Sequence, residues 1–282
     1  MKDSELIVND DGSIYHLALR PEELADTIIT VGDPDRVELV TRHFDTIEFT
    51  RKRREFVTQT GWIGKQRLTC LSTGMGSGNV DIVLNELDAL ANIDFTTRQH
   101  RSEPRELTIV RVGTSGSIRE DVAVDDILVS GVAIGLEGIM LWYEQRERTP
   151  TEEAWHQALE DVHLPLDSYV SESNGELMNR FSDLSVGVTL TTAGFYAPQS
   201  RSIRLRPMED DFLNRLSNIE VSGQFITNIE METAAIYGLS RALGHRALSI
   251  NAILANRLSG AFSTSPLKTV TQAIEYTLDR LI

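Results

Sequence analysis

Two arginines stand in segments that otherwise read as buried strands. Arg111 interrupts the apolar run 109–112, and Arg257 ends the run 253–257. An unpaired guanidinium in a protein interior costs several kcal/mol, so each arginine needs a carboxylate or an anion beside it. An internal salt bridge and a bound anionic ligand both meet this need, and the sequence leaves the two interpretations of Arg111 open.

Glycine-rich segments follow two of the predicted strands, and each has an arginine close by. The first runs from Gly32 to Arg36 and opens a helix, whose N-terminus favours an anion. The second, 113–116, offers backbone N–H groups and the Thr114 hydroxyl two residues after Arg111. Together the two predicted turns indicate a phosphate site, which neither would indicate alone.

Glu230, Met231 and Glu232 precede a helical pattern. Acidic residues in a first helical turn complement the helix dipole, and a carboxylate is equally suited to accept two hydrogen bonds from a sugar diol. The segment 74–79 (GMGSGN) is similar to a dinucleotide fingerprint, with Asp94 near the ribose-binding position. Asn79 occupies the place of the third glycine, so we disfavour a dehydrogenase.

The elements that must position these residues alternate between strand and helix. Predicted strands cover 26–31, 107–112, 186–191 and 247–254, and a hairpin with its turn at Gly61 covers 56–71. Helical spacing follows Gly76, recurs from Met231 to a stop at Gly244, and returns over 267–281. We expect residues 1–282 to form one three-layer α/β domain (αβα) with a mixed, largely parallel central sheet. Ligands in such folds bind beyond the carboxyl ends of the strands.

Two stretches break the regularity. The polar segment 96–106 is predicted to be a surface loop, and the charged segment 144–153, which contains Pro150, is predicted to be a mobile excursion. The basic run 51–54 is typical of a solvated strand edge.

Composition limits the function classes. The chain has 27 Lys and Arg against 42 Asp and Glu, a net charge of −15, which argues against nucleic-acid and anionic-membrane partners. No apolar run reaches the roughly 20 residues that cross a bilayer, and the acidic N-terminal residues do not resemble a signal peptide. With Cys70 as a lone, buried thiol, we expect a cytoplasmic protein. The six histidines show no metal-ligand spacing, so we expect no metal centre.

Taken together, the motifs resemble the uridine phosphorylase branch of the nucleoside phosphorylase superfamily. The resemblance extends from Tyr15-His16-Leu17 to Arg257-Leu258 and rests on an ordered set of segments: VGDPDR (31–36), RREF (53–56), STGMG (72–76), RVGTSG (111–116), GFYAPQSR (194–201), IEMETA (229–234) and ANRL (255–258).

The resemblance implies a role for each site residue. Phosphate would be bound by Gly32, Arg36, Arg111 and Thr114, with Arg54 supplied by a neighbouring subunit. Ribose would rest on Met231 and Glu232, with His16 of the neighbour near the 5′-hydroxyl. The base would pack on Phe195 and be read by Gln199 and Arg201, with Arg257 nearby.

The implied reaction is the reversible phosphorolysis of uridine to uracil and ribose 1-phosphate, a step of pyrimidine salvage. The preference among uridine, deoxyuridine and thymidine is left open. The residues expected to act in catalysis are Arg36, Arg111, Thr114, Glu232 and Arg257. Phosphate is a co-substrate, no cofactor is expected, and the presence of a monovalent cation at the interface near Glu55 is left open. Because two site residues come from a neighbour, the smallest active unit is expected to be a homodimer, and assembly into a hexamer is left open.

The base segment departs from the family pattern. Bacterial relatives read TFYPGQER, whereas Gly194, Ala197, Pro198 and Ser200 differ here, so strictness for uracil is left open. The polar insert 96–106 lengthens the link into the Arg111 strand, as in eukaryotic-type relatives, which weakens the expectation of a hexamer.

Three alternatives share the fold. A purine nucleoside phosphorylase is disfavoured by Gln199, Arg201 and Arg257. A nucleosidase, which uses water in place of phosphate, is disfavoured by the full set of arginines, because water does not need an anion site. A nucleoside-binding protein without turnover retains the same contacts, so the sequence does not separate it from the enzyme.

Overall fold

A mixed eleven-stranded sheet runs through the computed structural model, which describes residues 1–282 apart from 145, 161, 163, 165 and 166. The strands, in chain order, are β1 Thr27–Val31, β2 Thr46–Arg53, β3 Phe56–Ile63, β4 Gln66–Ser72, β5 Ile93–Asp94, β6 Gln99–His100, β7 Thr108–Ser117, β8 Ile127–Gly135, β9 Tyr169–Glu172, β10 Ser185–Thr191, β11 Glu220–Val221, β12 Gln224–Glu230 and β13 Arg246–Asn256. The α-helices are α1 Asp35–Thr41, α2 Ser77–Asn92, α3 Pro150–Glu160, α4 Gly175–Asn179, α5 Phe212–Ser217, α6 Thr233–Leu243 and α7 Pro266–Leu281.

The centre of the sheet is parallel. Strand β1 pairs in parallel with β4 and β7, and β13 pairs in parallel with β7. The other half is built on β8 and β10, which are parallel to each other, while β8 runs antiparallel to β13. The outer hairpin β2–β3 is antiparallel, with β2 at the sheet edge. The expected mixed, largely parallel sheet is confirmed.

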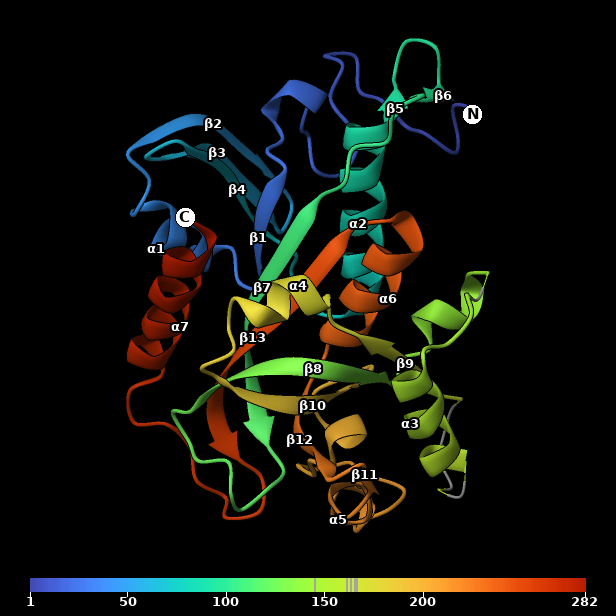
Figure 1. The fold of residues 1–282 in the computed structure, drawn as a ribbon, viewed down its shortest axis with the longest axis vertical. Coiled ribbons are helices and arrows are strands. Elements are labelled where there is room, and N and C mark those ends of the chain that lie inside the picture. Colours follow the sequence, from blue (N-terminus) through green and yellow to red (C-terminus); the bar gives the residue numbers. More distant parts are fainter. Residues whose placement is uncertain (145, 161, 163, 165–166) are drawn as a thin grey trace.

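Helices cover both faces because neighbouring strand residues point to opposite sides. Ile28 of β1 packs in the core cluster that contains α2 and α6, whereas Ile29 packs in the cluster that contains α1 and α7. Figure 1 shows the two helix pairs on either side of the central strands. A third cluster joins Trp155 of α3 and Phe212 of α5 to β8, β10 and β12. The three-layer αβα arrangement is therefore confirmed.

The predicted turn at Gly61 is wrong. Gly61 lies inside β3, paired with Ile47 and Leu68, and the hairpin turns instead at Gly64, whose φ is +57°. A Cβ on Gly61 would lie 2.0 Å from the carbonyl oxygen of Thr46, so glycine is required there by close packing of β2 rather than by a turn.

The predicted turn at 113–116 is also wrong. Strand β7 continues through these residues to Ser117 and pairs with β13 along its whole length. Its last residues also pair with β12, at Gly116 and Ser117. The backbone N–H groups of this segment therefore belong to a strand, and the sequence expectation that they form a phosphate-binding turn does not hold.

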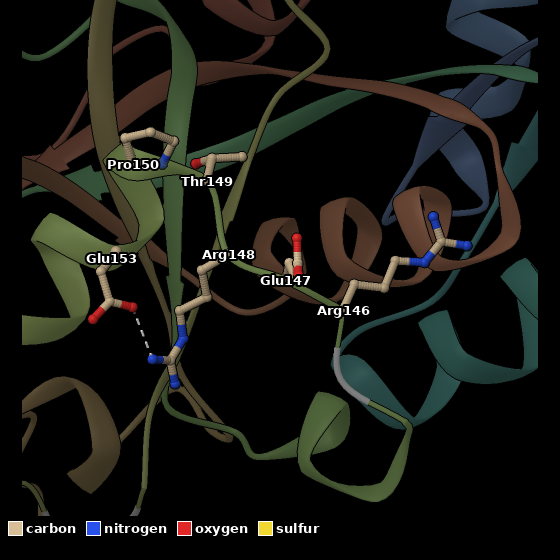
Figure 2. Close-up of a pocket in the computed structure, with 6 residues that line it drawn as sticks. All are labelled: Arg146, Glu147, Arg148, Thr149, Pro150 and Glu153. Atoms are coloured by element: carbon tan, nitrogen blue, oxygen red, sulfur yellow. Dashed lines mark hydrogen bonds and ion pairs between the residues drawn. The ribbon is translucent and has the colours of Figure 1, made fainter.

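The two irregular segments have different outcomes. Residues 96–106 form a largely exposed excursion that includes the short strand β6. The segment 144–153 is not simply a loop, because α3 begins at Pro150. There Arg148 forms an ion pair with Glu153 (Figure 2), with 3.0 Å between Nη1 and Oε2. Glu152 is buried and pairs with Arg241. Residue 145 lies outside the described residues.

The end of α6 and the burial of Cys70 confirm two further sequence expectations. Helix α6 ends at Gly244, whose φ of +81° gives the left-handed cap. Cys70 of β4 is fully buried, and burial raises the pKa of its thiol. No helix in the described part of the chain has the length and apolar character needed to cross a membrane.

Candidate active site

A cavity of about 640 Å³ opens beyond the carboxyl ends of β1, β4 and β12 and beside the C-terminal halves of β7 and β13. Its lining residues are Gly32, Asp33, Pro34, Arg36, Glu55, Gly74, Met75, Asn79, Arg111, Thr114, Ser115, Gly116, Phe195, Gln199, Arg201, Ile229, Glu230, Met231, Glu232, Leu254, Ala255 and Phe262. The cavity thus gathers every site residue named from the sequence except His16, Arg54 and Arg257.

Two neighbouring arginines line the cavity. Arg36 comes from the first turn of α1, and Arg111 from the middle of β7. Burial lowers the pKa of Arg36, and the nearby charge of Arg111 lowers it further, against the opposing effects of Asp33 and Glu232. Two guanidinium groups close enough to repel each other at a cavity wall form a natural site for an anion.

Arg111 has the carboxylate partners that its burial requires. Its Nη2 lies 2.7 Å from Glu232 Oε2 and 3.0 Å from Glu230 Oε2, and its side chain is 6% exposed. Although burial lowers the pKa of the Arg111 guanidinium, the two carboxylates raise it above its ordinary value, so the group stays charged. The salt-bridge interpretation is therefore correct, and the same side chain also lines the cavity.

Glu232 is held from two sides. Its Oε1 accepts a hydrogen bond of 2.7 Å from the backbone N–H of Gly76, and its Oε2 accepts the one from Arg111. Burial raises the pKa of Glu232 while Arg111 opposes that shift. A carboxylate has about four acceptor positions, so two contacts leave it capacity for a diol.

Gly113 provides the space for the Arg111 guanidinium. A Cβ built on Gly113 would lie 1.8 Å from Nη1 and 2.2 Å from Cζ of Arg111. The glycine in this strand is thus explained by a side chain that crosses it, two residues away on the same face.

An aromatic ring and a side-chain amide also line the cavity. Phe195 is half exposed, and the Arg201 guanidinium lies 3.6 Å from its ring centroid. The Arg201 Nη1 donates to the carbonyl oxygen of Phe195 at 2.8 Å and to the side-chain oxygen of Gln199. Burial lowers the pKa of Arg201 to about 10, and the charge of Arg257 lowers it as well.

The Gln199 side chain is almost fully buried, and its amide is occupied by the protein. Its Nε2 donates to Thr192 Oγ1 at 3.1 Å and to the Glu230 carbonyl oxygen at 3.4 Å, while its oxygen accepts from Arg201. The resemblance implies that this amide reads the base, and in the structure both of its polar atoms already have protein partners.

Arg257 is not among the residues that line the cavity. Its Nη2 donates to the backbone oxygen of Gln199 at 3.2 Å, and a Cβ on Gly116 would touch its Cγ and Cδ at 3.4 Å. Arg257 therefore supports the base segment from outside the cavity, and it differs from Arg111 in that burial alone lowers the pKa of its guanidinium.

His16 and Arg54 do not reach the cavity of their own subunit. His16 lies in the turn after Ile14 and contacts Glu86 of α2, while Arg54 is exposed in the β2–β3 turn with φ of +55°. Both positions agree with the expectation that these residues act in a neighbouring subunit, which the single chain does not test.

Several lining residues have no role among those that the family resemblance implies. Glu230 is the most important, because it binds Arg111 and also accepts from Thr191 Oγ1 and from the backbone N–H groups of Glu232 and Thr233. The signal for it was present in the Glu-Met-Glu segment. Asn79 and Phe262 carried no comparable signal, because each joins the cavity only through the tertiary fold.

Comparison with known proteins identifies the family to which the chain belongs. A model of the phosphorylase superfamily matches residues 26–279. The chain belongs to the phosphorylase superfamily. Among members of this superfamily, it is 28% identical to the uridine phosphorylase of Thermococcus kodakarensis over 90% of this chain and 81% of the relative. It is 24% identical to a DeoD-type purine nucleoside phosphorylase of Bacillus velezensis over 91% and 93%.

A solved structure of a nucleoside phosphorylase has a similar fold. The nucleoside phosphorylase of Trypanosoma brucei, described as showing uridine phosphorylase activity, superposes with a TM-score of 0.88 at 28% identity. The match covers 98% of this chain and 99% of the other. The chain is thus a nucleoside phosphorylase in its reaction class, which is pentosyl transfer.

Proposed function

We propose that this phosphorylase-superfamily member cleaves uridine with phosphate to give uracil and ribose 1-phosphate. The observation that carries the proposal is the set of groups that one cavity brings together: Arg36 and Arg111 with Glu232, and Phe195 with Gln199. A nucleoside bound with its base at Phe195 and Gln199 and its ribose at Glu232 would present its C1′ atom to a phosphate at the two arginines.

Catalysis in this arrangement depends on positioning the two substrates and on stabilising the negative charge that develops on the base. Phosphate, bound by Gly32, Arg36, Arg111 and Thr114, attacks C1′ as the C1′–N1 bond breaks. The bonding electron pair leaves with uracil, and Arg201, with Arg257 behind it, stabilises the developing negative charge. Met231 and Glu232 hold the ribose. Phosphate is consumed as a co-substrate, and no resident cofactor is required.

Gln199 would select a pyrimidine by exchanging one hydrogen bond. Its side-chain oxygen accepts from Arg201 in the structure and would accept from the base N3–H when uracil binds. The released Arg201 donor would then face the uracil O4. The exchange keeps these buried polar groups paired. The corresponding N1–H and O6 edge of hypoxanthine lies farther from the glycosidic nitrogen, so it would not meet Gln199 and Arg201 in the same way.

The direct test is base release from uridine and inosine, with and without phosphate, followed by absorbance. Phosphate-dependent release of uracil, with little release of hypoxanthine, is the expected result. Release without phosphate would indicate a nucleosidase, and preference for inosine would indicate a purine enzyme. A rise in melting temperature with uridine but no product would indicate a binding protein.

Gln199→Leu is expected to lower kcat/KM for uridine about 100-fold while changing the residual rate with inosine less than about threefold. Leucine has a similar size but leaves the polar edge of uracil, Thr192 and Arg201 without their partner. The two kcat/KM values are measured side by side, and an equal loss for both nucleosides would contradict the assignment.

A homodimer is the proposed active unit, with Arg54 and His16 completing the neighbour's site. If so, mixing Arg54→Ala with Glu232→Ala subunits under conditions of subunit exchange restores up to about a quarter of wild-type activity, because one site in the mixed dimer has both residues. The matched control mixes Arg54→Ala with Arg111→Ala, for which the same recovery is expected, and with His16→Ala, for which none is expected. Absence of recovery in the first mixture would show that each site is complete within one chain.

We further propose a cytoplasmic location. The acidic composition and the single, buried Cys70 support it. Fractionation of cells that express the chain, with activity as the marker, tests this assignment.

A further inference from the structure

His16 is held by a carboxylate that the proposed reaction does not otherwise use. Glu86 Oε1 lies 2.6 Å from His16 Nδ1, and both Glu86 oxygens accept the backbone N–H of His16 at 3.0 Å. Glu86 Oε2 also accepts the backbone N–H of Leu17 at 2.8 Å. The Glu86 side chain is 13% exposed and that of His16 is 25% exposed, so the contact is sheltered while the imidazole still reaches the surface.

These contacts fix which ring nitrogen carries the proton. A carboxylate only accepts hydrogen bonds, so the proton on neutral His16 must sit on Nδ1, which faces Glu86. Nε2 is then an acceptor. The neutral imidazole therefore presents an acceptor, rather than a donor, to any group that approaches its exposed edge.

Tyr15 joins His16 to the turn that carries Arg54. The Tyr15 ring packs edge-on to the His16 ring with centroids 4.7 Å apart. The Arg53 guanidinium lies 4.7 Å from the Tyr15 centroid, and that of Arg54 lies 6.0 Å away. His16 and Arg54, the two side chains proposed to enter the neighbouring site, are thus connected through the Tyr15 ring. Glu86 of α2 holds this group of residues in place through its contact with His16.

We propose that Glu86 is a positioning residue for the ribose end of the reaction, which rests on the proposed function above. It holds the His16 imidazole in the Nδ1–H form, so that Nε2 accepts a hydrogen bond from the 5′-hydroxyl of the nucleoside bound in the neighbouring subunit. The structure thereby assigns a specificity for nucleosides whose 5′ position donates a hydrogen bond.

Glutamine cannot replace Glu86 in this role. An amide has one oxygen and one NH2 group, so one of the two Glu86 positions would become a donor. If the NH2 group faces His16, the imidazole must shift its proton to Nε2 and present the wrong group to ribose. If it faces Leu17, two donors oppose each other and the turn loses its anchor.

The experiment compares uridine with 5′-deoxyuridine, which lacks only the 5′-hydroxyl. We expect Glu86→Gln to lower kcat/KM for uridine about tenfold, mainly through KM, and to change that for 5′-deoxyuridine less than about twofold. His16→Ala should give the same pattern, and the double variant should lose no more than either alone. The matched control is Glu5→Gln, the same change at an exposed residue of the N-terminal segment, which should alter neither substrate.

Equal losses on both substrates, or additive losses in the double variant, would overturn the assignment while leaving the proposed function intact. Absence of phosphorolysis by the wild-type enzyme would overturn the proposed function and this assignment with it. If Glu86→Gln does not fold, long-range 1H–15N spectra of the wild-type protein decide the point. At about pH 8 the His16 resonance, identified by its loss in His16→Ala, should show a proton on Nδ1, and a proton on Nε2 would refute the inference.

Discussion

Replacing Arg111 with methionine is expected to lower phosphate-dependent turnover about 100-fold or more. Methionine fills a similar volume but removes the charge that would contact phosphate in a dry site, and such contacts are worth about 2–5 kcal/mol. The loss should appear in kcat/KM for phosphate, measured at saturating uridine.

The same change leaves two buried carboxylates without a partner, because Arg111 pairs with both Glu230 and Glu232. We therefore expect a lower melting temperature for Arg111→Met. Arg111→Lys separates the two effects. Lysine keeps the charge and most of the stability but not the planar fork of donors, so activity should still fall about tenfold or more. If a folded Arg111→Met protein retains turnover within tenfold of wild type, the phosphate site lies elsewhere.

Gly113→Ala is expected to reduce turnover nearly as far without touching a charged group. The added Cβ would lie 1.8 Å from Arg111 Nη1, so the guanidinium must leave its position between the carboxylates. We expect a loss of about 100-fold in kcat/KM for phosphate, together with a lower melting temperature.

A matched glycine supplies the control. Gly175 begins α4, and an added Cβ there meets no atom within 4 Å, so Gly175→Ala should retain full activity. In the double variant Arg111→Met/Gly113→Ala, the glycine change should add nothing, because its target is already gone. Activity of Gly113→Ala within threefold of wild type would show that the guanidinium has room to adjust without loss.

The sequence predicts the elements of the fold better than the turns between them. Apolar periodicity places β1, α6 and α7 to within a few residues, because each buries a continuous face. Glycine is read as a turn residue at Gly61 and at 113–116, and both are strand positions. At Gly61 the group that excludes a side chain is the distant Thr46, and at Gly113 it is the Arg111 guanidinium two residues away. The direction of that guanidinium is set by Glu230 and Glu232, so the local sequence does not contain it.

The candidate site shows the same division. Arg111 stands out in the sequence because its burial demands a partner, and the structure supplies that partner in Glu230 and Glu232. The hydrogen bonds of Gln199 could not be anticipated, because they depend on Thr192 and the end of β12 meeting it in space. Residue types predict which chemistry is available, whereas tertiary contacts decide which atoms are free to perform it.

Cys70 makes the opening of this sheet directly measurable. It is the sole cysteine in the sequence, it is fully buried, and it lies in β4 between β1 and β3. A thiol reagent can therefore modify the protein only when that interior strand becomes accessible. The rate of labelling by a chromogenic disulfide reports this opening without any engineered probe, and the slowing of that rate by phosphate or uridine would give their binding free energies in the absence of turnover.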